Sequence, residues 1–142
     1  MARLHNKLSP EAFNGLAQDC LPGHLGIEIT ARGEGEIRAR MKVGGRHLAP
    51  NDFLHAASVV ALADTACGYA TIAHLPDGAE SFTTVELKSN HLGTLREGYA
   101  ACIASAQHIG RNTQVWDAVV SDEGSGRRLA LFRCTQMILW PK

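Results

Sequence analysis

Asp64 is the residue of this chain whose position most strongly suggests chemistry. It lies in the middle of an alanine-rich segment, residues 55–74, in which it is the single Asp, Glu, Lys or Arg. A buried carboxylate is costly to desolvate without a partner, and carboxylates with perturbed pKa values concentrate at functional sites. Two interpretations are therefore open. Asp64 is either a catalytic carboxylate or a structural one that accepts hydrogen bonds or faces a wet edge.

His55 stands at the entrance of the same segment and is the second candidate. We expect a helix over about residues 55–74, so the backbone N–H groups of Ala56 and Ala57 have no intrahelical acceptor. They also carry the positive end of the helix dipole, and such a helix end can stabilise a developing oxyanion. The alternative for a lone histidine at this place is a simple cap or surface residue.

The spacing of these two residues constrains how they can work together. His55 and Asp64 are nine residues apart, which in a helix is about 13.5 Å of rise and about half a turn of rotation. One helix therefore cannot bring both side chains to one reacting atom. If they share a site, the carboxylate comes from a second copy of the chain across a two-fold axis. This predicts an oligomer whose sites lie between subunits.

The remaining elements must enclose and position that helix. Ser9-Pro10-Glu11 predicts the start of a short helix over about residues 9–21, which Pro22-Gly23 should stop. Period-two alternation predicts two strands, and four further runs between glycine-containing breaks bring the number of predicted strands to six. They are residues 24–31, residues 36–43, Phe82–Leu92, Tyr99–His108, Thr113–Ser121 and Arg128–Trp140. The helix over 55–74 is apolar all round and must be enclosed. We therefore predict one α+β domain over residues 1–142, a curved, six-stranded, mostly antiparallel sheet wrapped around one long central helix.

Composition excludes several classes of function. Fourteen Lys and Arg balance fourteen Asp and Glu, so no basic surface for nucleic acid is indicated. The first residues lack the apolar core of a secretory signal, and the charge of Asp64 disfavours a membrane span over residues 55–74. The four cysteines are widely spaced and indicate free thiols in a reducing compartment, while the seven histidines show no metal-ligand spacing. We expect a cytoplasmic protein with no nucleic-acid or membrane partner and no metal.

The segment around these candidates resembles a known family. The pattern of Pro50, His55-Ala56-Ala57, Leu62-Ala63-Asp64, Gly68 and Ala70 resembles the N-P-x-G-x-x-H-G-G-x-x-x-x-L-A-D-x-A-x-G-x-A region of PaaI-like hotdog-fold acyl-CoA thioesterases. Downstream, T-V-E-L-K-S-N over residues 84–90, Gly98 and Gly110-Arg111 fall at further positions of the family pattern. The resemblance runs from about residue 24 to the C-terminus, and its implied hotdog fold agrees with the fold predicted above.

The resemblance implies hydrolysis of an acyl-CoA thioester. The family's catalytic carboxylate falls on Asp64, as general base or nucleophile, and its oxyanion donor on the N–H of Ala56 or Ala57, with His55 orienting the thioester. A hydroxyl that positions water in some relatives falls on Thr84. Alternation alone does not decide whether Thr84 or Thr83 faces the site.

The resemblance also gives substrate-binding candidates and partners. The candidates are Asn51, Phe53, Thr83 and Arg111, the last toward a CoA phosphate, and Phe53, Tyr69 and Phe82 are candidates for lining the acyl pocket. No cofactor is expected, because coenzyme A is part of the substrate. The expected assembly is a homodimer that associates further into a homotetramer.

Three departures from the family pattern leave other functions open. The family's His-Gly-Gly is His55-Ala56-Ala57 here, its Asn six residues before the His is Ala49, and its Gly three residues before the His is Asp52. Asn51 stands two places after the position of the family's Asn. The alternatives are a non-catalytic acyl-CoA binding protein and a hotdog hydratase or dehydratase, which would transfer protons beside an intact thioester.

Overall fold

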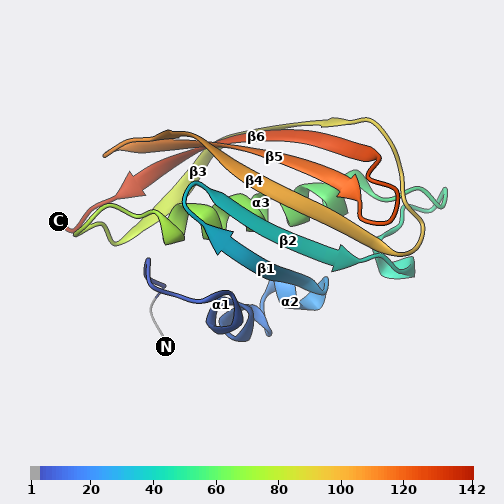
Figure 1. The fold of residues 1–142 in the computed structure, drawn as a ribbon, viewed down its shortest axis with the longest axis horizontal. Helices are drawn as coiled ribbons and strands as arrows, with labels where there is room; N and C mark the ends of the chain where they lie inside the picture. The colour runs from blue at the N-terminus through green and yellow to red at the C-terminus, as the bar shows by residue number, and fades with distance from the viewer. Residues whose placement is uncertain (1–3) are drawn as a thin grey trace.

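The computed structural model describes residues 4–142 as one long helix enclosed by a curved sheet (Figure 1). The helices are α1 (Pro10–Ala17), α2 (Leu21–His24) and α3 (Ala56–Ala73), with the 3-10 helix η1 at Gly45–His47. The strands are β1 (Ile27–Gly33), β2 (Glu36–Lys42), β3 (Ser81–His91), β4 (Tyr99–Ile109), β5 (Thr113–Asp122) and β6 (Arg128–Leu139). The predicted α+β class and hotdog architecture are confirmed.

The six strands form one sheet in the order β1-β2-β4-β5-β6-β3. Every pairing is antiparallel, where the sequence had predicted a mostly antiparallel sheet. The four strands that follow α3 begin and end within one residue of the predicted bounds. Glycine-containing turns separate them and mark their ends in the sequence, and burial alternates along β5 and β6 but not along β3. β3 lies at one edge of the sheet and has β6 as its neighbour.

Helix α3 crosses the concave face of this sheet and is the centre of the core. Leu62, Ala66 and Cys67 are fully buried against sheet residues such as Trp116 and Met41. The small side chains of α3 let the sheet curve closely around it. By length and composition α3 would also pass as a membrane span, but 56% of it is buried inside the protein, as expected for a core helix.

The N-terminal region differs from the prediction. Pro22-Gly23 does not stop a helix but lies inside the separate short helix α2, while α1 already ends at Ala17. Proline is compatible with the first turn because its missing N–H needs no acceptor there. A Cβ on Gly23 would lie 2.1 Å from the backbone oxygen of Gln18, so the glycine is required by close packing. The strand expected from residue 24 consequently begins at Ile27.

The sequence made Tyr69 a candidate for lining the acyl pocket, but in the structure it is a core residue. Its side chain is buried, with the ring centroid 4.3 Å from that of Phe13 on α1. Its hydroxyl donates a hydrogen bond to the backbone oxygen of Leu8. Tyr69 therefore attaches the N-terminal segment to α3, and its role in the structure is packing.

Candidate active site

The N-terminus of α3 carries two hydrogen-bond donors. His55 is the N-cap residue, and its Nδ1 accepts a hydrogen bond of 2.9 Å from the backbone N–H of Ala57. An accepting Nδ1 requires the neutral ring with its proton on Nε2. The N–H of Ala57 is therefore occupied, whereas the N–H of Ala56 has no acceptor among residues 4–142. The free donors at this exposed end are the Ala56 N–H and the His55 Nε2–H.

A short closed loop leads the chain into this helix end. Leu48 and Leu54 form an isolated antiparallel bridge, and the N–H of Ala49 donates to the oxygen of Phe53 over 2.7 Å. At the tip, Asp52 has φ of 64°, and it is the one non-glycine residue with positive φ in the described part of the chain. Asp52 stands where the family pattern has glycine, so the left-handed backbone is kept although the side chain has changed.

Two predicted substrate-binding residues lie on this loop. Asn51 is exposed, and its Oδ1 accepts from the N–H of Phe53 over 3.3 Å. The Phe53 ring is 49% exposed and lies under the Arg96 guanidinium at 5.4 Å. The Nε of Arg96 also donates to the oxygen of Asp52 over 2.9 Å, which ties the loop to the segment before β4. Asn51 and Phe53 thus lie close to His55, with side chains accessible to a ligand.

Asp64 occupies a different part of α3, about two and a half turns from the N-cap residue His55. The side chain is half-buried, and its Oδ1 is buried without a hydrogen-bond partner in the described structure. This burial raises the pKa of the carboxyl group above its ordinary value, with desolvation as the cause. A carboxylate held in an apolar helix with no compensating partner destabilises the fold, which favours a functional role over a structural one.

The pairing of β3 with β6 decides between the two threonines. Thr84 pairs with Gln136, which is fully buried on the inner face, whereas Thr83 pairs with the exposed Met137. Cross-strand partners point to the same side of a sheet. Thr84 therefore faces the side of α3, and Thr83 faces the outer surface, away from Asp64. The single-chain geometry thus does not bring the predicted substrate-binding residue Thr83 to the site.

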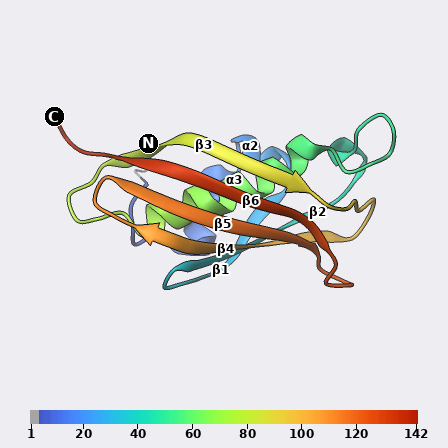
Figure 2. The ribbon, with the colours of Figure 1, turned by 90° about the horizontal axis from the view of Figure 1, so that it is seen from above.

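Thr84 is also placed level with Asp64 along the sheet. A Cβ on Gly68 would lie 3.3 Å from Cζ of Phe82, so these two positions are in contact. Helix α3 and strand β3 run in opposite directions (Figure 2). Asp64 lies about one helical turn before Gly68, and Thr84 lies two residues after Phe82. Because the two elements run in opposite directions, both steps lead the same way along the sheet, by about 6 Å. The two polar side chains therefore belong to the same neighbourhood.

A buried amide that the sequence did not predict as part of the site lies beside Thr84. Gln136 is fully buried, and neither its Oε1 nor its Nε2 has a partner in the described structure. Its neighbour on β5, Gln114, has a partner for each amide atom: Nε2 donates to the oxygen of His74 and Oε1 accepts from Trp116, both over 2.9 Å. The available signal was a glutamine at an inward position of the alternating β6 strand. The inner face thus carries a second unpartnered polar group near Asp64.

Arg111 lies far from His55 within one chain. It belongs to the β4–β5 turn, and its guanidinium covers the ring of Trp140 at 4.3 Å. This turn adjoins the C-terminal end of α3, because Gln114 hydrogen-bonds the oxygen of His74. His55 is at the other end of the same helix. A single chain therefore does not bring Arg111 to the N-terminus of α3.

A pocket of about 300 Å³ opens beside His55. Its walls come from α2, η1 and the first turns of α3, and they are mostly apolar, with one cationic residue. The lining residues are Leu21, Leu25, Arg46, Leu48, His55, Ala57, Ser58 and Ala61. The concave space next to the helix N-terminus is thus apolar in character.

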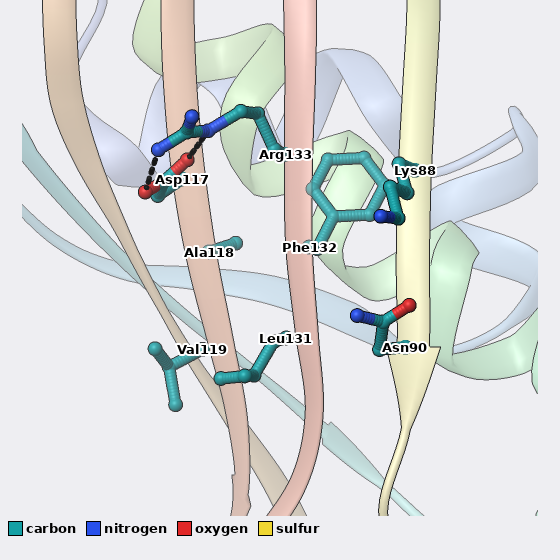
Figure 3. A pocket seen from close by; sticks show the side chains of 8 residues that line it. All are labelled: Lys88, Asn90, Asp117, Ala118, Val119, Leu131, Phe132 and Arg133. Atoms are coloured by element: carbon teal, nitrogen blue, oxygen red, sulfur yellow. Dashed lines mark hydrogen bonds and ion pairs between the residues drawn. The ribbon is translucent and has the colours of Figure 1, made fainter.

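A second hollow, of about 320 Å³, lies on the outer face of the sheet (Figure 3). It is bordered by Lys88 and Asn90 of β3 and by the ion pair in which Nη2 of Arg133 donates to Asp117 over 2.8 Å. None of the predicted site residues lines it. This hollow is therefore separate from the neighbourhood of Asp64.

With this geometry established, the relationship to known proteins is clear. The model of the Thioesterase superfamily matches residues 51–128, which include His55, Asp64 and Thr84. A putative esterase of Haemophilus influenzae is 36% identical over 113 residues, covering 80% of this chain and 81% of the relative. The proofreading thioesterase EntH of Cronobacter turicensis is 31% identical over 129 residues, covering 91% and 93%.

Solved structures agree with these relatives. The thioesterase HI1161 of Haemophilus influenzae has a TM-score of 0.86 and 32% identity, covering 96% of this chain and 94% of that one. A thioesterase family protein from Silicibacter pomeroyi has a TM-score of 0.80 and 29% identity, covering 91% and 96%. The chain belongs to the thioesterase superfamily. It is a thioester hydrolase with the hotdog fold, which confirms the predicted family.

Proposed function

We propose that the protein hydrolyses acyl-CoA thioesters and that Asp64 is the catalytic carboxylate. The observation that carries this proposal is the half-buried Asp64 side chain, whose Oδ1 has no partner inside an otherwise apolar helix. The choice of coenzyme A is supported by a relative, the 1,4-dihydroxy-2-naphthoyl-CoA hydrolase of Escherichia coli, which is 29% identical over 136 residues. It covers 94% of this chain and 96% of its own length.

The chemistry needs a base, a water molecule and an oxyanion site. Asp64 removes a proton from water as the water oxygen attacks the thioester carbonyl carbon. The carbonyl π electrons move to oxygen, and the resulting oxyanion accepts hydrogen bonds from the Ala56 N–H and the His55 Nε2–H. Collapse of this intermediate expels the CoA thiolate, which takes up the proton that Asp64 removed from water. Thr84, on the inner face level with Asp64, orients the water.

We propose further that each site is formed by two copies of the chain. The separation of nine positions between His55 and Asp64 keeps the His55 donor and the carboxylate about 13.5 Å apart along one helix. β3 is a free sheet edge with exposed apolar side chains at Val85 and Leu87, which is the type of edge that pairs with another chain. Antiparallel association there would also carry the partner's β4–β5 turn, with its arginine, toward His55. Association of dimers into a tetramer belongs to the same proposal.

The experiment is a thiol-release assay with a panel of aromatic and aliphatic acyl-CoAs. We expect release of free CoA by the wild type and a loss of about 100-fold or more in kcat for Asp64→Asn, with acyl-CoA binding retained. Asp77→Asn, which changes an exposed aspartate outside the site, is the matched control and should match the wild type. Full activity of Asp64→Asn, or absence of thiol release with every acyl-CoA, would overturn the proposal.

Two further measurements test the shared site and the catalytic role of Asp64. Mixing folded His55→Ala and Asp64→Ala chains should restore part of the activity, because a mixed dimer carries one intact site; no recovery in co-assembled mixtures refutes the shared site. A single turnover in ¹⁸O-labelled water distinguishes the roles of Asp64. If Asp64 is the general base, the label enters only the acid product, whereas label found in Asp64 itself would identify it as the nucleophile.

We propose a reducing, cytoplasmic location because the cysteines form no disulfide in the described structure. Cys20, Cys67, Cys102 and Cys134 are all free thiols, and three of them are buried. Burial raises the pKa of Cys102 to about 12, so this thiol stays protonated and unreactive at neutral pH. Localisation of a fluorescent fusion expressed from the native promoter tests this directly.

A further inference from the structure

His47 connects three segments through its ring and its backbone. It is 1% exposed. Its Nδ1 accepts from the N–H of Gly44 over 2.9 Å, and its Nε2 lies 2.7 Å from the oxygen of Leu25. Because Nδ1 is an acceptor, the ring is neutral and its proton lies on Nε2, which donates to Leu25. The ring thus ties the turn after β2 to the turn before β1.

The backbone oxygen of His47 holds the first turn of α3. It accepts from the N–H of His55 over 2.9 Å and from Oγ of the buried Ser58 over 2.8 Å. These two donors lie on either side of Ala56 in the sequence. The position of the Ala56 N–H and of the His55 ring is therefore set by where His47 places its carbonyl group.

From this geometry we infer that His47 is a positioning residue for the oxyanion site, acting through His55 and Ser58. The inference rests on the proposed function of the Ala56 N–H and the His55 ring. Donors stabilise an oxyanion when they lie about 2.7–3.1 Å from it, and a misplacement of about 1 Å can cost about 100-fold in rate. A residue with buried ring bonds to two fixed backbone groups provides that accuracy.

The other end of the same helix supplies a matched control. His74 caps the C-terminus of α3, where Nδ1 lies 2.7 Å from the oxygen of Ala70 and Nε2 accepts from the N–H of Gly35 over 2.9 Å. His74 therefore makes the same kind of contacts, two backbone partners for one neutral ring. It lies ten residues beyond Asp64 and holds no proposed donor.

The test compares His47→Asn with His74→Asn in the full-length protein. Asparagine keeps an acceptor near the position of Nδ1 but does not reach the second backbone partner. We expect both variants to lower Tm, but only His47→Asn to lower kcat, by about 10-fold to 100-fold, with KM within a few-fold. Ser58→Ala, which removes one bond to the His47 oxygen, should lower kcat in the same direction by less. Equal kcat losses in the two histidine variants, or an unchanged kcat in His47→Asn, would overturn the inference.

Two readouts do not depend on turnover and separate this inference from the proposed function. The ¹⁵N chemical shifts of the His47 ring should show an unprotonated Nδ1 and a protonated Nε2. Amide exchange at His55 should be at least about 10-fold faster in His47→Asn than in His74→Asn. A protonated Nδ1 or equal amide exchange in the two variants would refute the positioning role of His47 even in an active enzyme. If both readouts came out as expected but the wild type had no thioesterase activity, only the proposed function would be refuted.

Discussion

Replacing Asp64 by asparagine should stabilise the protein while it abolishes turnover. The carboxylate is half-buried, and its Oδ1 lacks a partner in the described structure, so its charged form is destabilised by desolvation. An unsatisfied buried polar group costs about 1–3 kcal/mol, and partial exposure to solvent reduces that cost. We expect a gain of about 1 kcal/mol at neutral pH for the neutral amide, which is about 2–4 °C in Tm for a chain of this size.

The stability gained by Asp64→Asn should be larger at neutral pH than at acidic pH. Burial raises the folded-state pKa of Asp64 above its ordinary value of 3.8, so between those two values the folded protein binds the proton more tightly than the unfolded chain. The wild type therefore loses stability as pH rises through this window. The advantage of Asp64→Asn should be full above the folded-state pKa and should shrink as pH falls toward 3.8.

Thermal unfolding followed by circular dichroism checks the stability gain and its pH dependence. All samples need one fixed protein concentration, because assembly of the chains contributes to Tm. The measurement compares the wild type, Asp64→Asn and the exposed control Asp77→Asn at neutral pH and near pH 4. A wild type more stable than Asp64→Asn at neutral pH would show that the carboxylate is paired in the native assembly. That result would refute the argument from desolvation.

Three other substitutions test the structure. Asp52→Gly should raise Tm by a few degrees, because glycine relieves a left-handed backbone that costs about 1 kcal/mol, whereas Asp52→Ala should lower it; thermal melts of both variants decide this. Gln136→Met should raise the free energy of unfolding by about 1 kcal/mol in urea titrations, since it removes two unpartnered amide atoms, and a loss of stability would indicate that they are bonded in solution. Tyr69→Phe should cost about 1 kcal/mol in the same titrations with kcat unchanged, because it removes only the bond to Leu8.

Most of the fold was predictable because its signals are local and repeated. The strands after α3 are ten to twelve residues long and are separated by glycine-containing turns, and the apolar helix before them has to be enclosed. The error at Pro22-Gly23 has a physical cause. These residues usually end a helix, but Gly23 packs against the backbone of Gln18, a contact that depends on how α1 and α2 pack together. Such contacts leave no periodic trace in the sequence.

The candidate site was predictable where a residue conflicts with its surroundings. Asp64 interrupts an uncharged helix, and His55 stands at the start of that helix. The choice between Thr83 and Thr84 needed the register with β6, including the irregularity between Thr84 and Glu86. His47 gave no signal, because its importance comes from hydrogen bonds to Leu25 and Gly44, which only the folded chain brings together.

The departures from the family pattern change side chains but not the backbone chemistry of the site. Asp52 keeps the left-handed conformation that the family provides with glycine. Ala56 and Ala57 lie in the first turn of α3, where helical φ and ψ values need no glycine. The free N–H of Ala56 is therefore preserved, and the Cβ of Ala57 instead narrows the apolar pocket beside His55. The alanines should consequently affect which acyl groups fit, while the Ala56 N–H stays available for its proposed contact with the oxyanion.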